Sequence, residues 1–220
     1  MSTVVIVGAN RGIGFELTRQ FKDRGDSVVA VCRKTSDELA ELEVEVIEGV
    51  DVTNERSLAR LVKAVGSRTI DVLVNNAGVL SDESLADLDV DRIRRQFEVN
   101  SLGPLRVTAA LRGNFDKGSK VAIVTSRMGS IEDNTSGGRY GYRMSKVAVN
   151  MAGRSLAHDL EEAGVAVVVL HPGFVRTDMT GRQGLIDPPE SAAGLIARID
   201  ELSLETTGTF RHTNGETIPW

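Results

Sequence analysis

The sequence is poor in features that would mark a secreted, metal-binding or nucleic-acid-binding protein. Its single cysteine, Cys32, excludes an internal disulfide and suits a reducing compartment. Lysine and arginine (26) are outnumbered by aspartate and glutamate (31), which argues against a nucleic-acid partner. No apolar run approaches the roughly 18 residues of a membrane span, and no basic, hydrophobic leader is visible. The three histidines lack metal-ligand spacing. We therefore expect a cytoplasmic protein with no membrane partner and no metal site.

What the chain does contain is a regular alternation of short apolar runs and amphipathic stretches. Parallel sheets covered by helices on both faces produce this pattern. We predict one α/β domain over residues 1–220, with a doubly wound parallel sheet. The expected strands lie at 3–7, 27–32, 44–48, 70–74, 121–125, 165–170 and 208–211. The expected helices lie at 12–24, 54–66, 89–112, 139–162 and 189–202.

A glycine-rich turn follows the first predicted strand. Its spacing is G-x-x-x-G-x-G, from Gly8 to Gly14, and a helical pattern comes next. Glycines let the backbone approach a pyrophosphate, and the helix N-terminus offers it free N–H groups. The alternative is a tight turn that binds nothing. The strand before it and the helix after it favour a nucleotide. The candidate ligands in this turn are Gly8, Asn10, Arg11, Gly12, Ile13 and Gly14.

The end of the second strand indicates which nucleotide is bound. An acidic residue there would bind a ribose 2′-hydroxyl, but the chain has Cys32 followed by Arg33. Together with Arg11, Arg33 would suit a 2′-phosphate, so we predict NADP(H); the alternative is two solvated surface arginines. Asp51, beside Val52, either accepts a bond from the adenine amino group or caps the next helix. Further along, Asn76, Ala77 and Gly78 allow close approach to a ribose or form a plain turn.

The chemistry is predicted to lie around the central strand at 121–125. Ser126 follows that strand, and Tyr142 and Lys146 stand four residues apart on the next helix, hence on one face. A phenol, an ammonium and a hydroxyl can protonate a carbonyl oxygen as hydride reaches its carbon. An ammonium about 6 Å away should by its charge lower the pKa of Tyr142 by about two units at an effective dielectric of ~20, and desolvation acts in the opposite direction. The alternative is a helix start with two snorkelling side chains.

Asn100 is an amide on an otherwise apolar stripe of the helix predicted at 89–112, so it needs a partner. Pro104, four residues later, cannot donate the usual helical bond to the Asn100 carbonyl. One hypothesis is that this carbonyl holds a water that starts a proton path to Lys146. The alternative is a helix kink.

Taken in order, these motifs resemble those of the short-chain dehydrogenase/reductases over nearly the whole chain. The glycine turn and Asn75-Asn76-Ala77-Gly78 match that family's cofactor motifs, and Asn100, Ser126, Tyr142 and Lys146 match its catalytic tetrad. The stretch from Arg127 to Lys146 and the Ile218-Pro219-Trp220 ending look like sniffer-type carbonyl reductases and C-factor-like proteins. The resemblance implies a Rossmann fold, with Tyr142 as proton donor, Ser126 on the substrate oxygen and Lys146 on the ribose. It also implies cofactor contacts from Pro172, Gly173, Val175 and Thr177.

We therefore expect NADPH-dependent reduction of an aldehyde, ketone or quinone by a homodimer or homotetramer. The spacing of sixteen residues between Ser126 and Tyr142 is longer than is common in the family and leaves Ser130 as an alternative serine. Two other functions stay open. One is a nucleotide-binding regulator of C-factor type that acts through a partner, and the other is oxidation of an alcohol with NAD.

Overall fold

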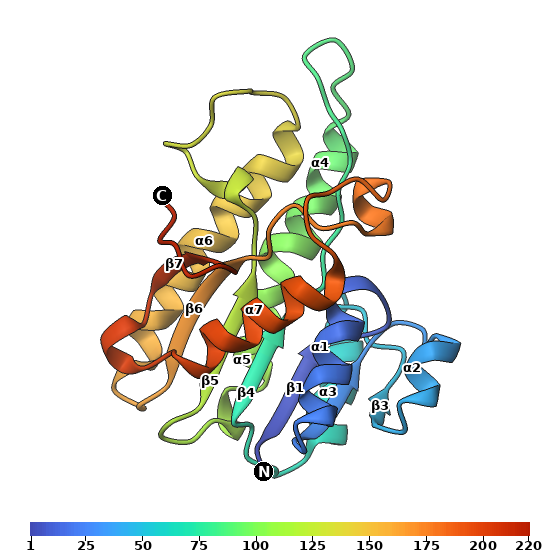
Figure 1. Cartoon of the computed structure of the whole chain (residues 1–220), viewed down its shortest axis with the longest axis vertical. Coiled ribbons are helices and arrows are strands. Elements are labelled where there is room, and N and C mark those ends of the chain that lie inside the picture. Colours follow the sequence, from blue (N-terminus) through green and yellow to red (C-terminus); the bar gives the residue numbers. More distant parts are fainter.

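Seven short strands form one parallel sheet in the computed structural model, which describes residues 1–220 (Figure 1). The sheet order is β3-β2-β1-β4-β5-β6-β7, and every neighbouring pair is parallel. The strands are β1 (Thr3–Val7), β2 (Ser27–Val31), β3 (Glu45–Ile47), β4 (Val72–Asn75), β5 (Lys120–Val124), β6 (Ala166–His171) and β7 (Thr209–His212). The predicted doubly wound α/β fold is confirmed.

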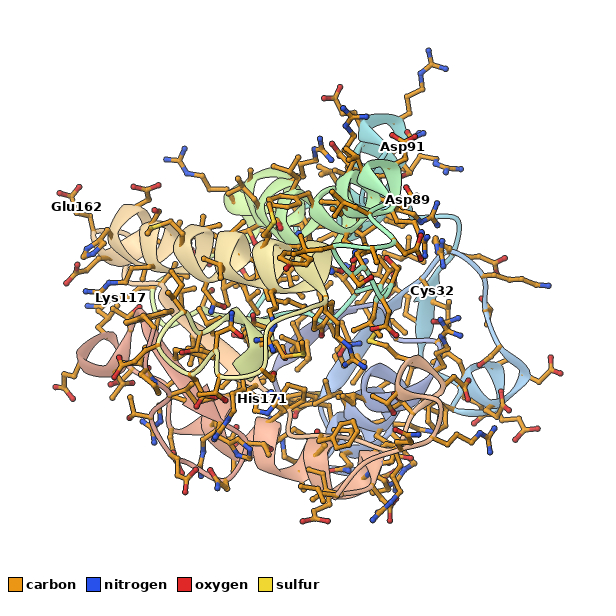
Figure 2. All side chains as sticks on the ribbon, turned by 90° about the horizontal axis from the view of Figure 1, so that it is seen from above. Cys32, Asp89, Asp91, Lys117, Glu162 and His171 are labelled. Carbon is orange, nitrogen blue, oxygen red and sulfur yellow. The ribbon has the colours of Figure 1, made fainter.

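Helices cover both faces of the sheet. The helices are α1 (Gly12–Asp23), α2 (Asp37–Glu41), α3 (Glu55–Val65), α4 (Val90–Phe97), α5 (Gly103–Ala110), α6 (Tyr140–Glu161) and α7 (Pro188–Asp200). The helices α1 and α7 pack on one face, and α3, α5 and α6 pack on the other. Seen from above, the long α6 and the α1–α7 layer lie on opposite sides of the sheet (Figure 2). No helix combines the length and the apolar character needed to cross a bilayer.

The alternation along β1 shows why the central strands are rich in apolar residues. Val5 and Val7 belong to the core under α3, α5 and α6, whereas Val4 and Ile6 belong to the core under α1 and α7. A strand that is buried on both faces needs apolar side chains at successive positions.

The chain reverses its direction of winding at β1. The strands β2 and β3 lie on one side of β1, and β4 to β7 lie on the other. In open α/β sheets a crevice forms at such a reversal, outside the carboxyl ends of the strands. Three long connections project beyond this edge, after β4, β5 and β6 (Figure 1, top).

The single helix predicted at 89–112 is wrong in detail. The structure has α4, then a π-helical segment at Glu98–Leu102, then α5, which ends at Ala110. The Gly103 N–H donates to the Glu98 carbonyl, five residues earlier. Pro104 lacks an N–H, so a regular α-helical ladder cannot continue through it, and the extra residue of the π turn absorbs the break. The water path from Asn100 stays a prediction.

Candidate active site

The glycine turn joins β1 to α1 and packs directly against the end of β4. Gly8 has a φ of +87°, and a Cβ there would lie 2.8 Å from the Ala77 Cα. The Asn76 side-chain amide donates to the Gly8 carbonyl over 2.9 Å. Only glycine combines this backbone conformation with such a close neighbour. The two turns at the reversal point therefore form one rigid unit.

A cleft of about 1050 Å³ opens above this unit at the carboxyl edge of β1, β2 and β4. Its volume and its continuous polar and apolar lining suit a ligand the size of a dinucleotide. The predicted cofactor residues that line it are Gly8, Asn10, Arg11, Gly12, Ile13, Arg33, Asp51, Val52, Asn76, Ala77, Gly78 and Thr177. Gly14, Tyr142, Lys146, Pro172, Gly173 and Val175 are not on its wall.

The predicted cofactor residues that do not line the cleft have different positions in the fold. A Cβ on Gly14 would meet the Gly8 carbonyl at 2.0 Å, so this glycine serves close packing. Pro172 accepts a bond from Ser191 through its carbonyl, and Val175 is buried and paired with Ile186. Contacts of Pro172, Gly173 and Val175 with a cofactor therefore stay predictions, and Thr177 marks where this connection reaches the cleft.

Four basic side chains in the wall of the cleft form no ion pair. The side chains of Arg11, Arg33, Lys34 and Arg95 line the wall, and none of them forms an ion pair within the chain. Lys34 and Arg95 were missed from the sequence. Lys34 directly follows Arg33 and could have been included as a basic pair, whereas Arg95 comes from α4, and no local pattern links it to the glycine turn. Unpaired guanidinium and ammonium groups are suited to a phosphate.

Asp51 lies among these cations and does not cap a helix. Asn54 caps α3, because its side chain accepts bonds from the N–H groups of Arg56 and Ser57. Burial opposes ionisation of Asp51, but bonds from Thr53 and the charges of Arg33 and Arg95 outweigh it and lower its pKa. Asp51 is therefore held as a carboxylate in the cleft wall, and its bond to adenine stays a prediction.

Ser126 and Tyr142 come together beside this cleft. Ser126 follows β5 and caps the short 3₁₀ turn Arg127–Gly129, and its Oγ accepts the Met128 N–H over 3.1 Å. Burial raises the pKa of Tyr142, and the Ser126 hydroxyl and the charge of Arg139 offset this only in part. Ser130 instead accepts the Asp133 N–H within its own loop. Ser126 is thus the serine that meets the phenol.

Lys146 lies near Tyr142 as predicted, but burial of the phenol opposes the lowering of the Tyr142 pKa that was expected from the lysine charge. Its ammonium lies 5.6 Å from the Tyr142 ring centroid and donates to the Val124 carbonyl over 3.1 Å. Burial lowers the pKa of Lys146 to about 8 and raises that of Tyr142. Both shifts have one cause, because removal from water disfavours the charged form of either group. The phenol is consequently held in its protonated form.

Asn100 is buried and finds its partners on two different elements. Its Oδ1 accepts the Val79 N–H over 2.8 Å, and its Nδ2 donates to the Val79 carbonyl and the Ser145 hydroxyl. Val79 follows the Asn75–Gly78 turn, and Ser145 precedes Lys146 in α6. The amide therefore fastens the connection after β4 to the helix that carries Tyr142.

A buried carboxylate at the start of α6 was not predicted from the sequence. Glu83 is only 3% exposed and accepts bonds from the Ser81 hydroxyl, the Gln96 amide and the Gly141 N–H. Its carbonyl also accepts the Arg139 N–H over 2.9 Å. A carboxylate at a helix N-terminus satisfies free N–H groups and complements the helix dipole. Glu83 thereby fixes the turn that precedes Tyr142.

The last residues of the chain contact the loop after Ser126. The Trp220 carbonyl oxygen accepts the Ile131 N–H over 2.5 Å, and the Trp220 ring packs on Phe210 with centroids 5.4 Å apart. The rim of the site therefore includes the end of the chain as well as the three long connections (Figure 1).

His171 ends β6 in the middle of the molecule, between the helical layers (Figure 2). The parallel register of β6 and β7 sets it opposite His212, with ring centroids 4.9 Å apart. Its Nδ1 is buried without a partner. Burial and the charges of His212, Arg127 and Lys146 lower its pKa to about 3.

This low pKa predicts acid-dependent stability. Between pH 6.5 and the folded pKa of about 3, the imidazole binds a proton in the unfolded chain but not in the folded chain. The folded state therefore becomes less stable as the pH is lowered through this range. The free energy of unfolding should fall by about 2 kcal/mol from pH 7 to pH 5 on account of this one group. Urea titrations of the wild type and His171→Gln check this, with His158→Gln on the exposed face of α6 as control. Equal pH slopes for all three proteins would remove His171 as the cause.

The fold, the cleft and the serine–tyrosine–lysine cluster define a nucleotide-binding oxidoreductase site, and comparisons with known proteins agree. Residues 2–185 match the family model described as short chain dehydrogenase. The chain is 46% identical over 226 residues to the 1-hydroxy-2-glutathionyl-2-methyl-3-butene dehydrogenase of Rhodococcus sp., covering 100% of both chains. It is 47% identical over 154 residues to the C-signal of Myxococcus xanthus, covering 69% of this chain and 93% of that one.

Two solved structures share the fold over the full length of this chain. They are the carbonyl reductase of Pseudomonas aeruginosa PAO1 in complex with NADP (TM-score 0.87, 31% identity, 100% of both chains) and the carbonyl reductase Sniffer of D. melanogaster (TM-score 0.89, 26% identity, 100% of both chains). The chain belongs to the short-chain dehydrogenase family. Members of this family are oxidoreductases that act on small molecules with a nicotinamide cofactor, and this confirms the class of protein predicted from the motifs.

Proposed function

We propose that this protein is an NADPH-dependent reductase of aldehydes, ketones or quinones, with Tyr142 as the general acid. The observation that carries the proposal is the buried group of Ser126, Tyr142 and Lys146 beside the nucleotide cleft. The raised pKa of Tyr142 keeps the phenol protonated, and a proton donor must start in that state.

Each residue of the group has a separate part in the reaction. A reduced nicotinamide cofactor bound in the cleft would supply the hydride that the carbonyl carbon needs. Ser126 donates a hydrogen bond to the carbonyl oxygen and orients it toward Tyr142, which gives up its phenolic proton. Lys146 would hold the cofactor ribose through its ammonium, and its charge would stabilise the phenolate left behind. Asn100 positions α6 through its bond to the Ser145 hydroxyl.

The preference for NADPH is assigned to the unpaired cations of the cleft. Arg33→Glu should raise the KM for NADPH at least about tenfold, because a charge-assisted bond to the 2′-phosphate becomes a repulsion. The KM for NADH should change no more than about twofold, since that cofactor lacks the phosphate. Steady-state kinetics with both cofactors measure the difference. Arg112→Glu is the control, because Arg112 is exposed in the turn after α5, at the opposite end of the strands from the cleft. An equal loss for NADPH and NADH would refute the assignment.

The proposed function is tested by cofactor binding followed by turnover. NADPH and NADH are titrated into the purified protein, and NADPH oxidation is then followed with a panel of aldehydes, ketones and quinones. The panel includes a glutathionyl alcohol with oxidised cofactor, because the Rhodococcus relative is named for such a substrate. Tight NADPH binding with turnover supports the reductase. Binding without any turnover favours a regulatory protein, as the C-signal similarity suggests. Absence of binding contradicts both functions.

We also propose that the protein is a cytoplasmic homodimer or homotetramer. The exposed apolar side chains of Leu102, Leu105, Met144 and Met151 come from the π segment, α5 and α6 and suit association of two such subunits. Light scattering of the purified protein measures the assembly.

A further inference from the structure

A second cavity, of about 640 Å³, opens between the connection after β4 and the loop after β5, beside the start of α6. It shares no wall residue with the nucleotide cleft. Met128, in its wall, donates its N–H to the Ser126 Oγ, so the cavity adjoins the site of reaction. A substrate whose carbonyl lies at Ser126 and Tyr142 can extend into this space.

The charged groups of this cavity are paired, with one exception. Arg139 forms an ion pair with Asp82 over 2.6 Å, and Asp87 forms one with Arg92 over 3.6 Å. Glu83 is buried, and its carboxylate already accepts several hydrogen bonds. The cation that remains is Arg143, which forms no ion pair.

Arg143 is nevertheless held in place. Its Nε donates to the Gly137 carbonyl over 3.2 Å, and its terminal nitrogen donates to the Ser136 hydroxyl over 2.8 Å. Its other N–H donors have no protein partner. Because the loop before α6 already fixes this guanidinium, it loses little freedom when a ligand binds, and its parallel N–H donors match the two oxygens of a carboxylate.

We propose that Arg143 binds a carboxylate carried by the substrate, at a distance from the carbonyl that is reduced. A singly charged carboxylate suits the site better than a phosphate, because Asp82, Glu83 and Asp87 in the same wall repel further negative charge. This inference rests on the proposed function, since it names the class of substrate that the reductase takes: aldehydes or ketones with an acid group elsewhere in the molecule.

The test compares acids with their own esters. A series of aldehyde carboxylates of increasing chain length and the matching methyl esters are assayed with NADPH and the wild type, Arg143→Gln and Arg143→Lys. Arg112→Gln is the control. In parallel, calorimetry measures binding of the corresponding alcohol carboxylates to each protein with oxidised cofactor present, which gives a readout that needs no turnover.

For at least one chain length, Arg143→Gln should raise the KM for the acid about tenfold to a hundredfold and leave the ester within about twofold. Arg143→Lys should raise the KM for the acid less than Arg143→Gln does, because lysine keeps the positive charge but lacks the parallel N–H donors of the guanidinium. Equal effects on acid and ester, or no effect, would overturn the inference. If no aldehyde is reduced, the proposed reductase fails, and the calorimetry decides the carboxylate site alone: weaker binding to Arg143→Gln supports it, whereas equal or absent binding removes it.

Discussion

Replacing Tyr142 with phenylalanine should lower kcat by about a thousandfold or more while the affinity for NADPH stays within about twofold. General acids contribute roughly 10²–10⁴ to a rate, and here the serine cannot substitute for the phenol. The aliphatic hydroxyl of Ser126 is a much weaker acid than a phenol and serves only as a hydrogen-bond donor. Phenylalanine keeps the ring and removes one oxygen, so the packing of α6 is conserved. Single-turnover kinetics with NADPH and any accepted carbonyl measure the loss.

Tyr140 offers a matched control for this experiment. It lies in the same turn of α6, and it carries the same hydroxyl but is only partly buried. Tyr140→Phe should leave kcat unchanged within about twofold. If Tyr142→Phe keeps most of its turnover, or if Tyr140→Phe loses it, the proton donor has been misassigned. A decrease in NADPH affinity in Tyr142→Phe would instead point to a disturbed cleft.

The second large effect concerns stability. Glu83→Leu should lower the free energy of unfolding by about 3–4 kcal/mol, because the Ser81 hydroxyl, the Gln96 amide and the Gly141 N–H would lose their buried acceptor. Because Glu83 accepts the N–H of Gly141, the residue before Tyr142, its loss should also displace Tyr142 and lower kcat. Chemical denaturation measures the loss, and Glu161→Leu, an exposed carboxylate at the other end of α6, is the control.

A double-mutant cycle with Gln96 separates the polar network from simple loss of volume. Glu83→Leu and Gln96→Leu together should be less destabilising than the sum of the single changes, by about 1–2 kcal/mol, because the orphaned amide disappears with its partner. Strictly additive losses would show that Gln96 and Glu83 are not coupled. Gly141 makes this coupling tight, since a Cβ there would lie 2.3 Å from the Gln96 amide nitrogen.

Local sequence patterns predicted a feature correctly where that feature depends on a single helix, strand or turn. The apolar run of β1 and the glycine turn after it predicted both the sheet and the nucleotide cleft, because strand burial and phosphate approach are dictated within about a dozen residues. The predicted start of α3, at residue 54, lies within one residue of the observed start for the same reason, because Asn54 is its local N-cap.

The features that were missed depend on contacts between distant segments. Glu83 and Gln96 meet only because the connection after β4 folds back onto α4 and α6, and neither residue shows a periodic signal. The proximity of His171 and His212 follows from the register of β6 and β7. The sign of the Tyr142 pKa shift could not be fixed either, because the depth of burial decides whether desolvation outweighs the nearby charges, and here it does.

The contact between Trp220 and the loop after Ser126 has a practical consequence for handling the protein. Met1 is fully exposed at the amino edge of the sheet, whereas Trp220 lies against the rim of the site (Figure 1). An affinity tag fused beyond Trp220 would pull on the backbone that holds Ile131, and so on the segment that carries Met128 and Ser126. Purification tags, surface tethers and fluorescent fusions therefore belong on Met1 if the measured activity is to be that of the undisturbed loop.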